Sequence, residues 1–207
     1  AVGGGLPAQI QFHDFDGDGF VDLLAVTNFS GIEFYRNDGG GGAPVHVPWM
    51  SSENPLRNLH IPPHPFLGSV VDLRGDGVPD IITANFHEKN KLYLGNTAGA
   101  FPYNPDTFEY NGAEKNVGAE SDPTMSLAVH DVDKDGNEDV IVGNFEAPNY
   151  VYFGDGNGNF PAKARIGLDS AKYTNSRTTS VKVADVNEDT FPDIVVANLE
   201  ADNEIFL

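Results

Sequence analysis

The chain has 207 residues, 40% of them hydrophobic, and a formal net charge of −19 from 31 acidic and 12 basic side chains. This composition is typical of a globular protein rather than a disordered one. Nucleic acid and anionic membranes are poor partners for so acidic a surface, because binding to either needs basic patches, so no nucleic-acid partner is expected. The absence of cysteine excludes disulfides and thiolate metal sites. No apolar run approaches the 18 residues of a membrane span, so no membrane insertion is expected.

One sequence pattern occurs four times along the chain. The leading aspartates of the four copies are Asp14, Asp72, Asp131 and Asp185, spaced 58, 59 and 54 residues apart. A period of this length is typical of a β-propeller blade. We therefore expect one repeat domain over 1–207, with repeats at about 1–50, 66–110, 124–168 and 178–207.

Each repeat predicts the same succession of strands. Before the acidic turn, apolar residues alternate, as Ile10 and Phe12 do in the first repeat, which predicts a strand with one buried face. After the turn comes a continuous apolar run (LLAV, IIT, VIV or IVV), which predicts a strand buried on both faces. Aromatic-rich third strands are expected at 32–35, 91–94, 150–153 and 204–207, with a weaker fourth strand after each Gly-rich turn. The predicted fold class is all-β.

The acidic turn follows the spacing D-x-D-x-D-G-x-x-D. Side chains at positions 1, 3 and 5, a backbone carbonyl at position 7 and a carboxylate at position 9 would form an oxygen cage, and Gly at position 6 permits the bend. Hard oxygen ligands favour Ca²⁺ over zinc or copper. An EF-hand is rejected, because its Glu at position 12 is replaced here by Ala25, Thr83, Val142 or Val196.

The four loops differ in how completely they match this pattern. Loops 1 and 3 are complete, whereas loop 4 carries Thr190 in place of the Gly, which should strain the bend. Loop 2 has Arg74 at position 3, where a guanidinium would itself neutralise the carboxylates, so about three calcium sites are expected and the fourth is doubted. The predicted ligands are Asp14, Asp16, Asp18, Phe20 and Asp22; Asp131, Asp133, Asp135, Asn137 and Asp139; Asp185, Asn187, Asp189, Phe191 and Asp193; and, more weakly, Asp72, Asp76, Val78 and Asp80.

A single Asp-Gly cluster would be an ordinary turn, but four in phase between two strands favour metal binding. Fourteen of the 31 acidic residues occupy predicted ligand positions, which attributes much of the charge to these loops. Other polar residues receive structural interpretations. His13 and His130 are expected to hydrogen-bond locally, and the Asn that recurs as Asn28 is expected to be structural. His60, His64 and Trp49 are assigned to surface loops or core capping.

The D-x-D-x-D-G-x-x-D loop, the DIVVAN-type strand after it and the VYFGDGNGNF hairpin resemble the FG-GAP/VCBS repeats, the blades of integrin-α-like β-propellers. The resemblance implies four-stranded blades whose calcium loops join the first and second strands. It also implies extracellular proteins that act in adhesion or in carbohydrate or protein binding. The family usually closes rings of about seven blades. We therefore expect a part of a larger or assembled propeller, with repeat 4 truncated or completed by residues 1–7 or by another chain.

The sequence contains no nucleophile elbow, His-Glu metal motif or phosphate loop, so we expect a protein that is not an enzyme. The leading hypothesis is an extracellular or secreted calcium-binding repeat protein that binds carbohydrate or protein. Two alternatives remain open: a structural subunit of an extracellular fibre or coat, made of further copies of itself, and an accessory propeller of a secreted hydrolase.

Overall fold

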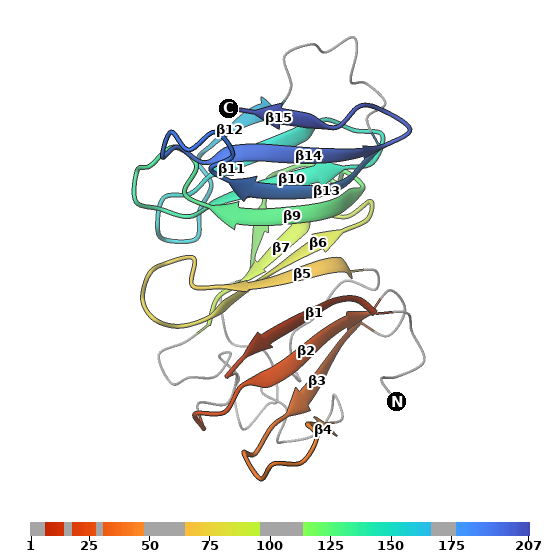
Figure 1. Cartoon of the computed structure of the whole chain (residues 1–207), viewed down its shortest axis with the longest axis vertical. Coiled ribbons are helices and arrows are strands. Elements are labelled where there is room, and N and C mark those ends of the chain that lie inside the picture. Colours follow the sequence, from red (N-terminus) through yellow and green to blue (C-terminus); the bar gives the residue numbers. More distant parts are fainter. Residues whose placement is uncertain (1–6, 15–17, 28–30, 48–64, 96–113, 167–176) are drawn as a thin grey trace. The chain divides into compact units, whose positions relative to one another are not determined.

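The computed structural model describes residues 7–14, 18–27, 31–47, 65–95, 114–166 and 177–207. All regular elements in these ranges are strands, and the described residues include no helix that could cross a membrane (Figure 1). The strands are β1 (Pro7–His13), β2 (Asp22–Thr27), β3 (Gly31–Arg36), β4 (Val45–Val47), β5 (Pro65–Val71), β6 (Asp80–Asn85), β7 (Asn90–Tyr93), β8 (Glu114–Val117), β9 (Thr124–His130), β10 (Asp139–Asn144), β11 (Asn149–Phe153), β12 (Ala162–Ile166), β13 (Arg177–Ala184), β14 (Asp193–Leu199) and β15 (Glu204–Phe206).

The strands form four sheets, each built from consecutive strands. Three sheets have four strands, in the orders β1-β2-β3-β4, β5-β6-β7-β8 and β9-β10-β11-β12, and the fourth is β13-β14-β15. The predicted all-β fold is confirmed, including the weakly signalled fourth strands β4, β8 and β12. Strand β8 lies beyond residue 110, where the second repeat was expected to end.

The described chain divides into two compact units. Strands β1 to β5 belong to the first unit and β9 to β15 to the second, while the sheet β5–β8 contributes residues to both. In the sheet β1–β4, strand β1 pairs antiparallel with β2 from Pro7 to His13. Two of the four short apolar runs behave as predicted, because every residue of β6 and of β10 is buried. In the other two runs, Leu23 of β2 and Val195 of β14 are half-buried.

One burial prediction is wrong. The alternating pattern in β1 placed Ile10 and Phe12 on a buried face, but their side chains are 47% and 67% exposed. The equivalent strands β9 and β13 are also edge strands, yet Leu127 and Val181 are buried, so the position of a strand at the edge of its sheet does not explain this exposure. Period-two alternation identifies a strand and its two faces, but it does not say which other element will cover a face.

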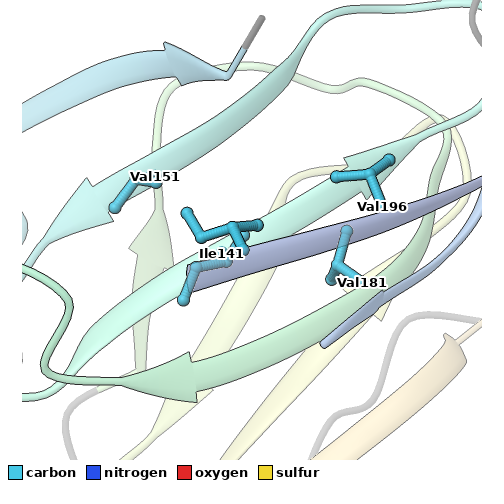
Figure 2. Packing of buried hydrophobic residues seen from close by; sticks show 5 residues of the cluster. Ile141, Val151, Val181 and Val196 are labelled. Carbon is cyan, nitrogen blue, oxygen red and sulfur yellow. The ribbon is translucent and has the colours of Figure 1, made fainter. Parts of the chain in front are cut away.

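The core of the second unit lies between the sheets β9–β12 and β13–β15. Ile141 of β10 and Val151 of β11 pack with Val181 of β13 and Val196 of β14 (Figure 2). Ile194 completes the buried cluster, and Phe206 of β15 packs at its margin. Branched aliphatic side chains fill such a space between two pleated surfaces well. This packing holds the acidic loops, which precede β10 and β14, on rigid strands.

Candidate metal centre

The loop between β9 and β10 is organised by its first aspartate. Asp131 Oδ1 accepts the backbone N–H of Asp135 (3.1 Å), and its Oδ2 accepts that of Gly136 (2.9 Å). Asp135 Oδ1 accepts the N–H of Asn137 (2.8 Å). A short acidic side chain that hydrogen-bonds its own following backbone is a common way to stabilise a tight turn. The carboxylates at positions 1 and 5 therefore shape the loop as well as carry its charge.

The same hydrogen bonds occur in all four loops. The aspartate at position 1 accepts the N–H groups of positions 5 and 6, and the aspartate at position 5 accepts that of position 7, in the loops that begin at Asp14, Asp72 and Asp185. Position 6 has a positive φ throughout, including 74° at Thr190 in loop 4. A threonine in this conformation is strained, as the sequence predicted, because its branched Cβ crowds the backbone.

The aspartate at position 9 is buried and connects the loop to the end of the third strand. Asp139 is fully buried, and its Oδ2 accepts the N–H of Val132 in the loop (2.9 Å). Its Oδ1 accepts the N–H of Gly154, just after β11 (2.9 Å). Asp22 and Asp80 receive the equivalent N–H groups of Asn37 and Gly95, both at 2.8 Å. Sequence reasoning assigned these aspartates only to metal, and their structural role was missed.

Loop 3 brings three carboxylates together. The oxygens of Asp131, Asp133 and Asp139 lie within 4.8 Å of one another, with Asp139 buried, Asp131 half-buried and Asp133 exposed. Burial raises the pKa of Asp139, and the nearby charges of Asp133 and Asp131 raise it further, against the lowering effect of the Gly154 and Val132 N–H groups. A hard divalent cation would remove this repulsion, and an all-oxygen donor set fits calcium.

The other predicted ligands are placed less closely. Among the residues that the structure describes, loop 3 alone brings three acidic ligand atoms within that distance. Asp16 of loop 1 lies outside the described residues, as do Asn28, Trp49, His60 and His64. Asp18 forms an ion pair with Arg36 at 3.9 Å. In loop 4, Asn187 donates its side-chain amide to Asp189 (3.0 Å).

The predicted local hydrogen bond of His130 is confirmed, because its Nδ1 donates to the Asp131 carbonyl at 3.1 Å. Loops 3 and 4 also touch each other: the Lys134 ammonium lies 4.0 Å from the centre of the Phe191 ring. This cation–π contact is a modest stabilising interaction at an exposed site. The spacing of the aspartates did not predict this contact between Lys134 and Phe191.

A chain of buried asparagines and threonines connects successive sheets. Asn149 Oδ1 accepts the backbone N–H of Asn144 (2.7 Å), and its Nδ2 donates to Thr178 Oγ1 on β13 (2.9 Å). Thr178 Oγ1 donates to Asn198 Oδ1 (2.8 Å). The same bonds run through Asn85, Asn90 and Thr124 one repeat earlier. The recurring Asn is therefore structural at Asn85, Asn144 and Asn198, and a second Asn five residues later in each of these three repeats was the overlooked signal.

An open cavity of about 470 Å³ beside β11 and β12 is lined by Glu120, Tyr152, Lys163 and Phe160, among others. The Tyr152 hydroxyl donates to Glu120 Oε2 (2.9 Å), and Lys163 pairs with Glu120 Oε1. The Lys163 ammonium is the main cause that lowers the pKa of Glu120 to about 2. Burial raises the pKa of Tyr152. The sequence analysis did not predict this group of Glu120, Tyr152 and Lys163.

Replacing Glu120 with glutamine should lower stability only where the carboxylate is charged. Because the folded pKa of about 2 lies below the ordinary glutamate value of 4.5, the ionised pair stabilises the fold above pH 4.5 and loses this effect as the pH falls toward 2. The effect should stay below about 1 kcal/mol, because the pair is partly exposed. Melting temperatures of Glu120→Gln and of the exposed control Glu88→Gln, measured from pH 2 to pH 7, test this expectation. A constant difference across that range would contradict it.

An all-β chain of consecutive antiparallel sheets, each with an acidic loop between its first and second strands, is a protein of β-propeller blades. The family model described as FG-GAP-like repeat matches residues 72–142 and 131–196, together more than half of the chain. The chain belongs to this FG-GAP-like repeat family.

Two solved structures support the fold. Both are complexes of BBS1N with ARL6DN, one from crystals soaked with mercury and one from crystals soaked with lead. The first has a TM-score of 0.54 at 12% identity and covers 98% of this chain and 51% of that chain. The second has a TM-score of 0.55 at 12% identity and covers 99% and 57%. This chain thus spans about half the length of the structures it matches, and no curated protein matches its sequence.

Proposed function

We propose that this chain is an extracellular calcium-binding β-propeller repeat protein that acts in adhesion, ligand binding or surface assembly, and that calcium has a structural role. The carboxylate cluster of Asp131, Asp133 and Asp139 is the observation that carries the proposal. Three negative charges this close repel, and Asp139 is fully buried among them. A bound calcium ion would cancel that repulsion and supply the positive charge that a buried carboxylate needs.

The position of Asp139 indicates what calcium would stabilise. This aspartate receives N–H groups from the loop and from Gly154 at the end of β11. An ion held by Asp139 therefore couples the loop to both neighbouring strands of the blade. We propose about three such sites, with affinities on the order of 10⁻⁴–10⁻³ M, as in other extracellular modules.

We propose a binding role rather than an enzymatic one. The similar solved structures are complexes of BBS1N with another protein, which supports protein binding by this kind of scaffold. The partner we propose is an extracellular protein or a carbohydrate. We assign recognition to the stretches of sequence that differ most between the repeats, because loops on a regular scaffold commonly carry recognition.

Calcium should raise the melting temperature of the chain. At a free concentration about ten times Kd, each occupied site adds about 1.4 kcal/mol to the free energy of unfolding. Differential scanning calorimetry in calcium, in magnesium and in EGTA measures the shift, and isothermal titration gives the number of sites. A melting temperature that is identical in calcium and EGTA would refute the structural role.

A pair of charge-matched variants assigns the site. Asp133→Arg copies Arg74, the residue at the same position of loop 2, and should remove one calcium from the titration. Asp202→Arg makes the same change at an exposed position outside the loops and should leave the stoichiometry unchanged. Equal stoichiometry in both variants would contradict the assignment to loop 3.

A further inference from the structure

The open cavity beside β11 and β12 is separate from the acidic loops. It holds about 470 Å³, and all of its lining residues belong to the second compact unit. This volume lies within the range of about 300–1,000 Å³ that is usual for small-molecule sites. Its polar side chains are Lys89, Asn116, Glu120, Tyr152 and Lys163, none of which is a predicted metal ligand. Calcium binding at the loops therefore requires none of these groups.

The carboxylate in the cavity is held in place by its neighbours. Tyr152, which is 3% exposed, donates its hydroxyl to Glu120 Oε2 at 2.9 Å, and the Ala119 N–H donates to the same oxygen at 3.0 Å. Lys163 pairs with Oε1. Gly118 has a φ of 81°, and a Cβ there would lie 2.5 Å from the Tyr152 ring, so a side chain at this position would displace the tyrosine. The carboxylate is thus fixed before a ligand arrives, which lowers the entropic cost of binding.

The ring of Phe160 lines the cavity from the hairpin between β11 and β12, and it is half-buried. The turn before it is held by Asp155, which accepts the backbone N–H of Asn159 at 3.0 Å and its side-chain amide at 2.8 Å. Lys115 donates to Asn159 Oδ1 at 2.8 Å and so ties the turn to β8. The aromatic ring therefore follows a well-anchored turn.

The lining carries a surplus of positive charge. Lys163 and Glu120 neutralise each other, whereas the exposed ammonium of Lys89 has no ion-pair partner among the residues that the structure describes. Within the same residues, the side-chain amide of Asn116 has no hydrogen-bond partner. Two ammonium groups and one carboxylate in one cavity stand out in a chain of net charge −19. An anionic group of a ligand is therefore favoured beside Lys89.

The mixture of polar and aromatic groups narrows the chemistry of the ligand. Asn116 can donate and accept hydrogen bonds, and the Glu120 carboxylate accepts them, which suits hydroxyl groups. The C–H face of a sugar ring can stack on an aromatic ring such as that of Phe160. An aliphatic ligand would leave the polar groups unpaired, and a polyphosphate would need more cations than the lining has. A sugar with one carboxylate matches each group.

We propose, resting on the ligand-binding role above, that this cavity binds a sugar that carries a carboxylate, namely a hexuronate. The sugar carboxylate pairs with Lys89, the ring stacks on Phe160, and a hydroxyl group hydrogen-bonds to Asn116. Glu120 accepts from a further hydroxyl and repels the sugar carboxylate, so the sugar binds in one orientation.

Isothermal titration of the full chain in saturating calcium tests the ligand class. Glucuronate should bind saturably. Glucose lacks the carboxylate and acetate lacks the ring, so each should bind about tenfold more weakly or less. A tetrasaccharide that contains glucuronate distinguishes the source of the ligand: tighter binding than that of glucuronate identifies a polysaccharide, and equal binding identifies a single sugar unit.

A pair of matched variants tests the site. Lys89→Gln removes the unpaired ammonium and should weaken glucuronate binding about tenfold. Lys182→Gln makes the same change at an exposed lysine of β13 outside the cavity and should leave binding unchanged. Phe160→Leu keeps an apolar side chain but removes the ring, and it should also weaken binding.

Absence of saturable glucuronate binding, acetate binding as tight as that of glucuronate, or equal effects of Lys89→Gln and Lys182→Gln would each overturn the proposal. The melting shift between calcium and EGTA is measured on the same samples. A retained calcium shift together with binding of neutral glycans or proteins, but not of glucuronate, would remove the hexuronate site and leave the proposed function standing.

Discussion

Replacing Gly154 with alanine should lower the free energy of unfolding by about 3 kcal/mol. The added Cβ would lie 2.2 Å from the backbone carbonyl oxygen of Glu138, and a backbone atom cannot turn aside as a flexible side chain can. Relief requires the end of β11 to move away from the loop. That movement would also break the bond from the Gly154 N–H to the buried Asp139 carboxylate.

Gly42→Ala is the matched control for this substitution. Gly42 is exposed, and a Cβ built on it meets nothing within 4 Å. Its effect should lie within about 0.5 kcal/mol of zero, as for most surface changes. Urea denaturation followed by circular dichroism, in saturating calcium, measures both variants. Similar losses in the two would show that the contact between the strand end and the loop does not govern stability.

Asn149→Ala should be comparably destabilising, by about 3 kcal/mol, for an electrostatic rather than a steric reason. Asn149 is only 6% exposed, and its amide both accepts the N–H of Asn144 and donates to Thr178. Alanine leaves that N–H buried without an acceptor and removes a hydrogen bond between β13 and the preceding sheet. The cost of an unpaired buried group exceeds the net gain of an ordinary hydrogen bond.

The same substitution in the next repeat provides the control. Asn203 accepts the N–H of Asn198 at 2.9 Å, as Asn149 does that of Asn144, but Asn203 is exposed. Water can replace its amide, so Asn203→Ala should cost less than about 1 kcal/mol. Thermal and urea unfolding of the two variants give the comparison. A double variant of Asn149→Ala with Thr178→Val should lose less than the sum of the two, because both changes break one bond.

The acidic loops were predictable because their information is local. The residues of each loop that hydrogen-bond to one another lie within seven positions, and the turn is closed by Asp131 and Asp135 through their own backbone neighbours. The strain at Thr190 was predictable for the same reason, since the conformation required at position 6 depends on the turn alone. Strands β6 and β10 follow from short, continuous apolar runs that need burial on both faces.

The amino-acid sequence by itself therefore determined the repeat, the strand order within it and the position of the acidic turns. Tertiary structure decided the exposure of Ile10 and Phe12, the bond between Asp139 and Gly154, and the link from Asn149 to Thr178, 29 residues later. These features depend on which strand ends meet and which sheets pack together. The spacing of residues within one repeat does not predict these contacts, because they depend on the register and packing of strands that are distant along the chain.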